Sequence, residues 1–394
     1  MRIADEISGC IIGQFSKVKH LTAPNFATFR AVFPGLPIKC FLVPADTFDN
    51  VNGKFPIGFF VWKLHDMTTL LSKDGRKSGP AQFTSIIADV YDRSGELTGI
   101  HTVFCPDKGT LWMDWLKKMH DKRGCCIGHL RTTCSDFQNQ NGTFITSQPS
   151  ANDILQRRTH EITVNNIADI ATAFAVRISV EATWLNDRDQ FLFPNVKWKK
   201  DKGFQIDCIV FTLFHGQNRI MSRNGVNHWI PFTEKEVNAQ GLFKSHFMSD
   251  FINGRADRPL AAAPVAARPP YQDDLFAETP HLNSENPVNH IKENSTNPAP
   301  PRLYVKENLS PAARAVLDTG RELWRYYHAQ PDADPNASYY DIRAYFQGCK
   351  PNGAMNAKSG DATYNALLAA LRIAHKALAA QIEPKVYEYG FLKR

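Results

Sequence analysis

The stretch FLVPADTFDNVNGKFPIGFFVWKL, residues 41–64, contains two apolar runs separated by a polar passage. Apolar and aromatic runs bounded by Asp, Asn and Gly are typical of strands joined by a turn. We therefore expect strands at 38–43 and 55–63. Two later runs, 84–92 and 95–104, predict a hairpin around Arg93-Ser94-Gly95. Shorter strands are expected at CCIGHL (125–130) and GTFITS (142–147).

Helical spacing dominates the remainder of the chain. It predicts helices at 25–33, 111–120, 165–185, 203–216 and 233–254, and three more at 310–330, 337–348 and 361–382. Periodicity alone allows a helix or a strand at 203–216, and length favours the helix. Asn165 or Asn166 could cap the helix at 165–185, Thr233 with Glu236 forms a capping box, and most of WRYYH (324–328) is expected in the core. These elements predict an α/β N-terminal region and an all-α C-terminal domain.

Residues 255–301 divide the chain, because they hold 9 of its 24 prolines and few large apolar residues. Such a composition is typical of an extended or disordered linker. We therefore expect an α/β region at 1–254, a proline-rich linker at 255–301 and a helical domain at 302–394. The length of 394 residues is enough for more than one hydrophobic core.

The composition restricts the classes of function and location. A net charge of +7 permits a nucleic-acid partner without demanding one. The 8 cysteines have no regular spacing, and the N-terminus lacks the basic start and apolar run of a signal peptide. No stretch reaches the roughly 20 apolar residues that a membrane span needs. We therefore expect a cytoplasmic protein with reduced thiols and no membrane partner.

Several motifs together resemble a known family. They are FLVPADTFDNVNGKFPIGFFVW, FTLFHGQNRI, NHWIPFTEKEV, GRELWRYYH, YYDIRAYFQG and KVYEYGFLK. They resemble the C-terminal half of large bacterial N6-adenine DNA methyltransferases of restriction–modification type. The resemblance covers nearly the whole chain. It implies that residues 38–63 are late strands of a methyltransferase-like sheet, that DNA is a partner, and that the complete enzyme uses S-adenosylmethionine.

The catalytic signatures of that family are missing from the chain. The Gly-rich candidates for a cofactor turn, at 7–15 and 32–37, do not follow a convincing strand, and no Asn-Pro-Pro-Tyr loop occurs. We therefore assign no catalytic and no cofactor-binding residues. We expect the chain to bind no cofactor and to be inactive alone, with an upstream methyltransferase half or subunit as its partner. Whether the chain should be counted as an enzyme stays open.

Two polar segments have the residue types that contact DNA. NVKWKKDKGF (195–204) interleaves lysines with Trp198 and Phe204, which suits phosphate contact with some stacking. HGQNRIMSRNGVNHW (215–229) is rich in Asn, Gln and Arg, which hydrogen-bond base edges. The predicted DNA-binding residues are Lys197, Lys199, Lys200, Lys202, Gln217, Asn218, Arg219, Arg223 and Asn224. A solvated loop and a polar structural turn are the alternative interpretations of these segments.

Other interpretations have weaker support. Cys125, Cys126, His129 and Cys134 lack the paired spacing of a structural zinc site, so we expect no metal there. The spacing at 215–229 does not fit an HNH-type nuclease. A non-catalytic protein–protein interaction module that uses the helices of 310–382 is the main alternative to the methyltransferase hypothesis.

Overall fold

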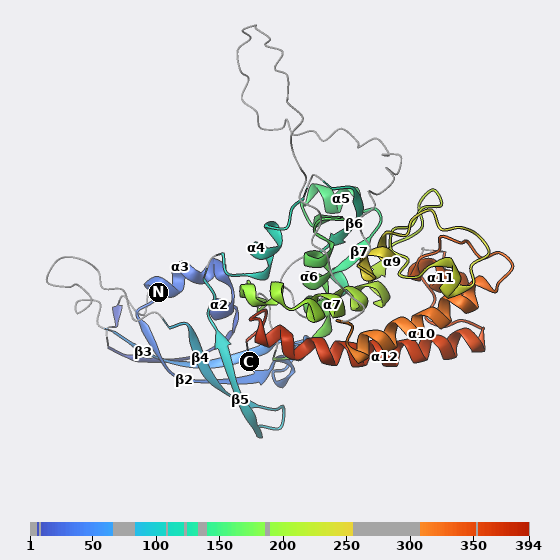
Figure 1. The fold of residues 1–394 in the computed structure, drawn as a ribbon. Coiled ribbons are helices and arrows are strands. Elements are labelled where there is room, and N and C mark those ends of the chain that lie inside the picture. Colours follow the sequence, from blue (N-terminus) through green and yellow to red (C-terminus); the bar gives the residue numbers. More distant parts are fainter. Residues whose placement is uncertain are drawn as a thin grey trace, which may run out of the picture.

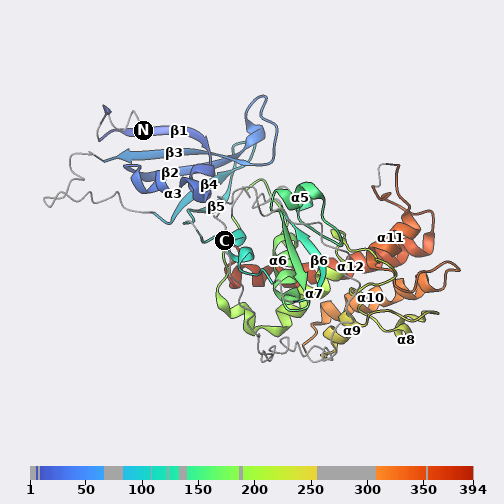
Figure 2. The same cartoon turned by 90° about the horizontal axis from the view of Figure 1, so that it is seen from above.

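The computed structural model describes residues 6–7, 9–65, 83–107, 109–121, 124–132, 140–185, 190–254, 308–351 and 354–393. The predicted linker at 255–301 lies outside these ranges, so the division of the chain at that segment stays a prediction. The described residues form an α/β N-terminal region with two mixed sheets and a helical C-terminal part (Figures 1 and 2). None of the helices in these ranges is both long and apolar enough to cross a membrane.

The first sheet confirms the predicted strand pair and hairpin. It has five strands in the order β1-β3-β2-β4-β5: β1 (Ile11–Lys17), β2 (Gly35–Pro44), β3 (Pro56–Leu64), β4 (Ser85–Tyr91) and β5 (Leu97–Phe104). All neighbours pair antiparallel except β2 and β4, which are parallel. Asp92 accepts hydrogen bonds from the Ser94 and Glu96 amides, and this stabilises the turn between β4 and β5. Strand β1 was not predicted from the sequence.

One face of this sheet is covered by short helices. They are α2 (Lys19–Thr22), the 3₁₀ turn η1 (Pro24–Phe26) and α3 (Ala27–Val32); η1 and α3 occupy the region predicted as one helix at 25–33, and α2 precedes it. Phe60 and Trp62 of β3 lie under them, at 1% and 2% exposure. They form a separate small core together with Val18, Leu21, Cys40, Leu42, Ile86, Ala88, Val103 and Cys105. A second 3₁₀ turn, η2 (Ala45–Thr47), follows β2.

The second sheet has four strands in the order β8-β6-β7-β9. They are β6 (Cys126–Arg131), β7 (Phe144–Thr146), β8 (Thr159–Thr163) and β9 (Asn218–Arg219). β7 and β9 pair parallel, whereas the other pairs are antiparallel. Leu130, Ile145 and Ile162 point into the protein and are fully buried. The short elements α4 (Trp112–Lys117), η3 (Gln140–Gly142) and α5 (Ala151–Leu155) flank these strands along the chain.

Two buried helices form the centre of the larger core. α6 (Ile167–Ser179) is shorter than the predicted 165–185, and Asn166 makes no cap bond; its amide instead donates to the Met119 and Glu161 carbonyls. α7 (Lys202–Phe214) confirms the choice of helix, with Asp201 as its N-cap. Every residue from Phe204 to Phe214 is buried, which explains why no polar face is visible in its sequence. The 3₁₀ turn η4 (Val196–Lys200) precedes it.

The C-terminal helices pack into this same core. They are α10 (Pro311–His328), α11 (Tyr339–Gln347) and α12 (Ala362–Glu388), and α10 begins at the predicted cap Ser310. The core cluster extends from Trp112 to Leu392, so residues on both sides of 255–307 contribute to it. A Cβ atom on Gly320 of α10 would lie 2.3 Å from the Phe214 ring, so glycine permits the close approach of α10 to α7. The predicted core residues Trp324, Tyr327 and His328 are buried.

The predicted helix at 233–254 is divided into two. The capping box of Thr233 and Glu236 is confirmed, but α8 (Glu234–Val237) ends after one turn. Asn238 adopts the left-handed conformation, with φ of 55°, which stops the helix there. α9 (Phe247–Ile252) follows after a loop.

A buried carboxyl group connects the central helix to both long C-terminal helices. Asp207 of α7 is 5% exposed and accepts hydrogen bonds from Ser310 Oγ (2.7 Å) and Gln381 Nε2 (3.1 Å). Burial, with nearby Asp201, raises its pKa to about 6, and the two hydrogen bonds lower the pKa only in part. Because the folded pKa exceeds the unfolded value, Asp207 destabilises the fold above pH 6, and this penalty disappears below about pH 4.

We therefore predict that Asp207→Asn stabilises the protein at pH 7.5 by about 1–3 kcal/mol, because it removes a buried charge and keeps a polar group. The gain should shrink as the pH falls towards 4, where the wild-type carboxyl becomes neutral. Urea denaturation at the two pH values measures the difference. Asp332→Asn, at an exposed position, is the control and should change stability by less than about 0.5 kcal/mol. If Asp207→Asn were less stable than wild type at both pH values, the prediction would be contradicted.

Candidate nucleic-acid interface

The segment 215–227 leaves the end of α7 and crosses the edge of the second sheet. β9 pairs with β7 there, and the chain then turns back through a tight bridge between Arg223 and Val226. Asn224 and Gly225 both have positive φ, 52° and 70°, so this pair forms the turn that its sequence indicates. The predicted DNA-contacting segment is thus a short strand followed by a tight turn at Asn224-Gly225.

Asn218 has a structural role within this segment. It is 4% exposed, and its amide donates to the Thr212 and Leu213 carbonyls while its side-chain oxygen accepts from the Ile220 amide. These bonds satisfy carbonyls at the end of α7 and fix the start of β9. The hydrogen-bonding groups of Asn218 are therefore used inside the protein, unlike those of its exposed neighbour Arg219.

Arg219 and Arg223 are exposed on the outer side of this segment. The Arg219 side chain contacts its own segment, because its Nη2 donates to Gln217 Oε1 at 3.1 Å. Arg223 donates to the Ser147 carbonyl and to Gln148 Oε1, both at 3.3 Å. In the described part of the chain, neither guanidinium group has a carboxylate within ion-pair distance. Both keep donors that an anion or a base edge can use.

A third arginine and a phenyl ring extend this surface across the sheet. Phe144 of β7 lies between Arg219 of β9, whose guanidinium carbon is 4.0 Å from the ring centre, and Arg131 of β6 at 5.3 Å. Arg131 also pairs with Asp153 at 3.0 Å. The guanidinium of Arg219 is partly shielded from water although the residue is exposed as a whole, and this desolvation, with Arg131 and Arg343 nearby, lowers its pKa. We call Arg131, Phe144, Arg219 and Arg223 the arginine face.

Two members of this face, Arg131 and Phe144, are absent from the residues predicted from sequence. Arg131 and His129 alternate with buried Leu130, which is the period of a strand with one outward side. That alternation could have placed Arg131 on the solvent side. It could not have placed it beside Arg219, because the pairing of β6, β7 and β9 joins segments nearly 90 residues apart.

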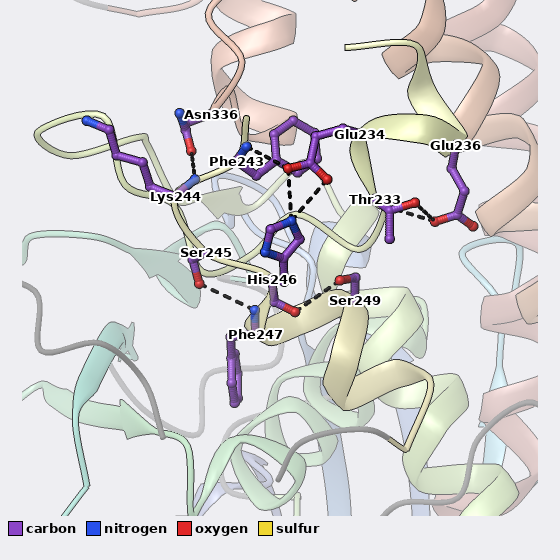
Figure 3. Close-up of polar contacts among 10 residues, drawn as sticks. All are labelled: Thr233, Glu234, Glu236, Phe243, Lys244, Ser245, His246, Phe247, Ser249 and Asn336. Atoms are coloured by element: carbon purple, nitrogen blue, oxygen red, sulfur yellow. Dashed lines mark hydrogen bonds and ion pairs between the residues drawn. The ribbon is translucent and has the colours of Figure 1, made fainter. Parts of the chain in front are cut away.

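A neighbouring loop adds another basic side chain. Glu234 accepts hydrogen bonds from the Phe243 amide at 2.8 Å and from His246 Nε2 at 2.9 Å, and so holds the loop between α8 and α9 (Figure 3). The amide of Lys244 in this loop donates to Asn336 Oδ1 at 2.9 Å. Its exposed ammonium group lies 3.5 Å from the Asn224 carbonyl. The loop therefore positions Lys244 beside the Asn224-Gly225 turn.

The lysine segment lies elsewhere in the fold. Lys197, Lys199 and Lys200 are exposed on η4, with Lys199 Nζ 4.0 Å from Asp169 Oδ2, and half-buried Lys202 begins α7. The predicted stacking role of Trp198 and Phe204 is wrong, because both rings are buried and pack near Phe391. The lysines and the arginine face lie at opposite ends of α7, about 20 Å apart along a helix of 13 residues.

The described members of the cluster Cys125, Cys126, His129 and Cys134 do not form a metal site. Cys126 Sγ lies 3.8 Å from His129 Nε2, and burial lowers the pKa of His129. The fourth member, Cys134, lies outside the described residues. Among those that are described, no group of three or more His, Cys, Asp or Glu side chains could hold a metal ion.

Comparison with known proteins adds no relative: no family model, curated protein or solved structure matches the chain significantly.

We predict that Asn218→Ala lowers the free energy of unfolding by about 1–3 kcal/mol, because it leaves buried backbone groups without partners. Gln217→Ala is the adjacent control and should change stability by less than about 0.5 kcal/mol, since its side-chain bonds are exposed. Equilibrium urea denaturation followed by tryptophan fluorescence measures both. If Asn218→Ala were as stable as wild type, the structural role of this amide would be wrong.

Proposed function

We propose that this chain is a DNA-contacting protein that binds through the arginine face. The observation that carries the proposal is the position of Phe144 between two guanidinium groups, with exposed Arg219 and Arg223 free of carboxylate partners in the described part of the chain. Arg131 is paired with Asp153, but the positive charge of Arg219 and Arg223 has no matching acid in the described part of the chain and favours a polyanionic ligand. Planar guanidinium groups suit phosphates and guanine edges, since each can donate two parallel hydrogen bonds.

The two basic segments are suited to different contacts. Arg219 and Arg223 project from a strand and a tight turn, and such rigid elements favour the directional hydrogen bonds that distinguish base pairs. Lys199 and Lys200 carry point charges on flexible stems, which favour phosphate contact independent of sequence. The length of α7 between them, about 20 Å, corresponds to roughly six base pairs of B-form DNA.

Within this proposal, the chain is the C-terminal portion of an adenine-specific DNA methyltransferase of a restriction–modification system. The sequence motifs at 41–62, 211–220 and 385–393 support that assignment by resemblance. The chain would contribute DNA binding and target recognition, and an upstream methyltransferase half or subunit would bind S-adenosylmethionine. The alternative, a helical interaction module at 310–382, would have to use polar sides of α10 and α12, because their apolar sides are buried in the core.

We predict that Arg219→Gln with Arg223→Gln weakens DNA binding more on a preferred sequence than on random DNA. Loss of a base-reading arginine should cost about 1–3 kcal/mol on the preferred duplex and much less on a scrambled one. Fluorescence anisotropy across a salt series measures the effect, using labelled duplexes of about two helical turns. The preferred duplex is selected from a random pool by the wild-type chain.

The matched variant is Lys199→Gln with Lys200→Gln, which removes the same number of charges at the other end of α7. It should weaken binding equally on both duplexes and reduce the salt slope by up to about two. Equal losses for both double variants on both duplexes would reduce the arginine face to a phosphate contact. Unchanged affinity of the Arg219 and Arg223 variant would refute DNA binding by this face.

A further inference from the structure

The outer face of the five-stranded sheet is apolar and open to solvent. A row of aromatic side chains crosses it on four neighbouring strands: Phe15 of β1, Phe59 of β3, Phe41 of β2 and Tyr91 of β4. Phe15 is directly opposite Phe59, and Phe59 is directly opposite Phe41. Successive ring centres are 4.8, 5.2 and 5.7 Å apart. We call this side of the sheet, with its flanking side chains, the aromatic face.

Exposed aliphatic side chains continue the aromatic face on both sides of that row. Ile11 at one edge is 65% exposed, and Ile87 and Ile100 at the other are 68% and 73% exposed. Such apolar side chains seldom gather on a sheet face that only water covers, because exposed apolar area costs free energy. Glycine at position 13 leaves room for the Phe59 ring on this face, since a Cβ atom there would lie 2.7 Å from that ring.

The charged side chains in the middle of this face are paired within the chain, whereas Lys17 and Lys63 are exposed on its β1 and β3 side. Lys39 pairs with Asp89 at 3.1 Å on neighbouring strands, and Arg93 lies 3.7 Å from Asp46. A polyanion would have to compete with these carboxylates in the middle of the face. Two identical copies can meet over the middle of the face without opposing like charges, because Lys39 and Asp89 pair with each other there.

The size of the aromatic face fits an interface between two copies. Five strands spaced about 4.8 Å apart span about 24 Å, and strands of seven to ten residues extend about 23–33 Å. The resulting footprint of about 650 Å² is close to the roughly 800 Å² per partner of a standard protein interface. Sheets that pack face to face lie about 10 Å apart, and their side chains interdigitate. The apolar rows of two aromatic faces can interdigitate in this way.

We propose that the aromatic face binds the same face of a second copy of this chain, related by a two-fold axis. This association uses neither the arginine face nor the lysine segment and does not depend on DNA binding. It leaves the arginine face of each copy open, since that face belongs to the other sheet.

Sedimentation velocity of the full chain at about 1–100 µM tests the proposal. The wild type should sediment with twice the chain mass of 44.4 kDa at the higher concentrations. The double variant Ile87→Lys with Ile100→Lys should be monomeric throughout, because it places four uncompensated charges in the symmetric interface. Its fold should survive, since both side chains are at least 68% exposed in the single chain. Circular dichroism checks this directly.

Ile373→Lys is the matched control, because Ile373 on α12 is also 73% exposed but lies outside the aromatic face. It should leave the dimer intact. A wild-type chain that stays monomeric, or a dimer that persists in the folded double variant, would overturn the proposal. If the monomeric wild type instead bound an oligo-dT probe, and Phe15→Ala weakened that binding, the aromatic face would be a surface for nucleotide stacking and not a dimer interface.

Discussion

Enclosure of α7 by α6, α10 and α12 is the constraint on which the larger part of the structure depends. Eleven consecutive residues of α7 are buried, so the helix has no side that could face water if any of its neighbours were absent. The Phe211 ring stacks on His375 of α12 at 4.3 Å, and Phe214 meets Gly320 of α10. The helix also fixes the two basic segments, because one precedes its first turn and the other follows its last.

The strands with clear alternation and the capped helices could be predicted from the sequence. β3 and β4 alternate between buried and outward residues, and Ser310 with Pro311 marks the start of α10. β1 escapes prediction because residues on both of its sides are largely exposed, so it lacks the period of a half-buried strand. The predicted end of α6 lies too late, since apolar residues continue past Ser179 towards the core of the first sheet.

The candidate site could be predicted only in part. Exposed Arg219, Arg223 and the lysines are recognisable from residue type, because arginine and lysine in polar loops usually reach solvent. The buried state of Asn218 and Trp198 depends on tertiary contacts that local composition does not reveal. Phe144 and Arg131 join the site through strand pairing between distant segments. The parallel pairing of β7 and β9 cannot be recognised from neighbouring residues. More than 70 residues, many of them in the larger core, separate the two strands in the sequence.

The two surfaces divide the molecule by chemistry. The first sheet presents aromatic and aliphatic side chains around the paired Lys39 and Asp89, whereas the second presents guanidinium groups around one phenyl ring. The exposed apolar area of the aromatic face is suited to contact with another protein surface. The positive charge of Arg219 and Arg223 on the arginine face is suited to an anion. Self-association and DNA contact are therefore proposed for different sheets, connected by the core around α7.

Residues on both sides of the proline-rich segment contribute to one core, and a cut within that segment tests this shared core most directly. A specific protease site introduced between residues 275 and 290 would allow cleavage of the folded chain without change to any described residue. We expect two fragments on a denaturing gel that co-elute in native gel filtration and unfold together in urea, with one transition. Fragments that separate without denaturant, leaving a C-terminal piece that stays helical alone, would contradict a shared core.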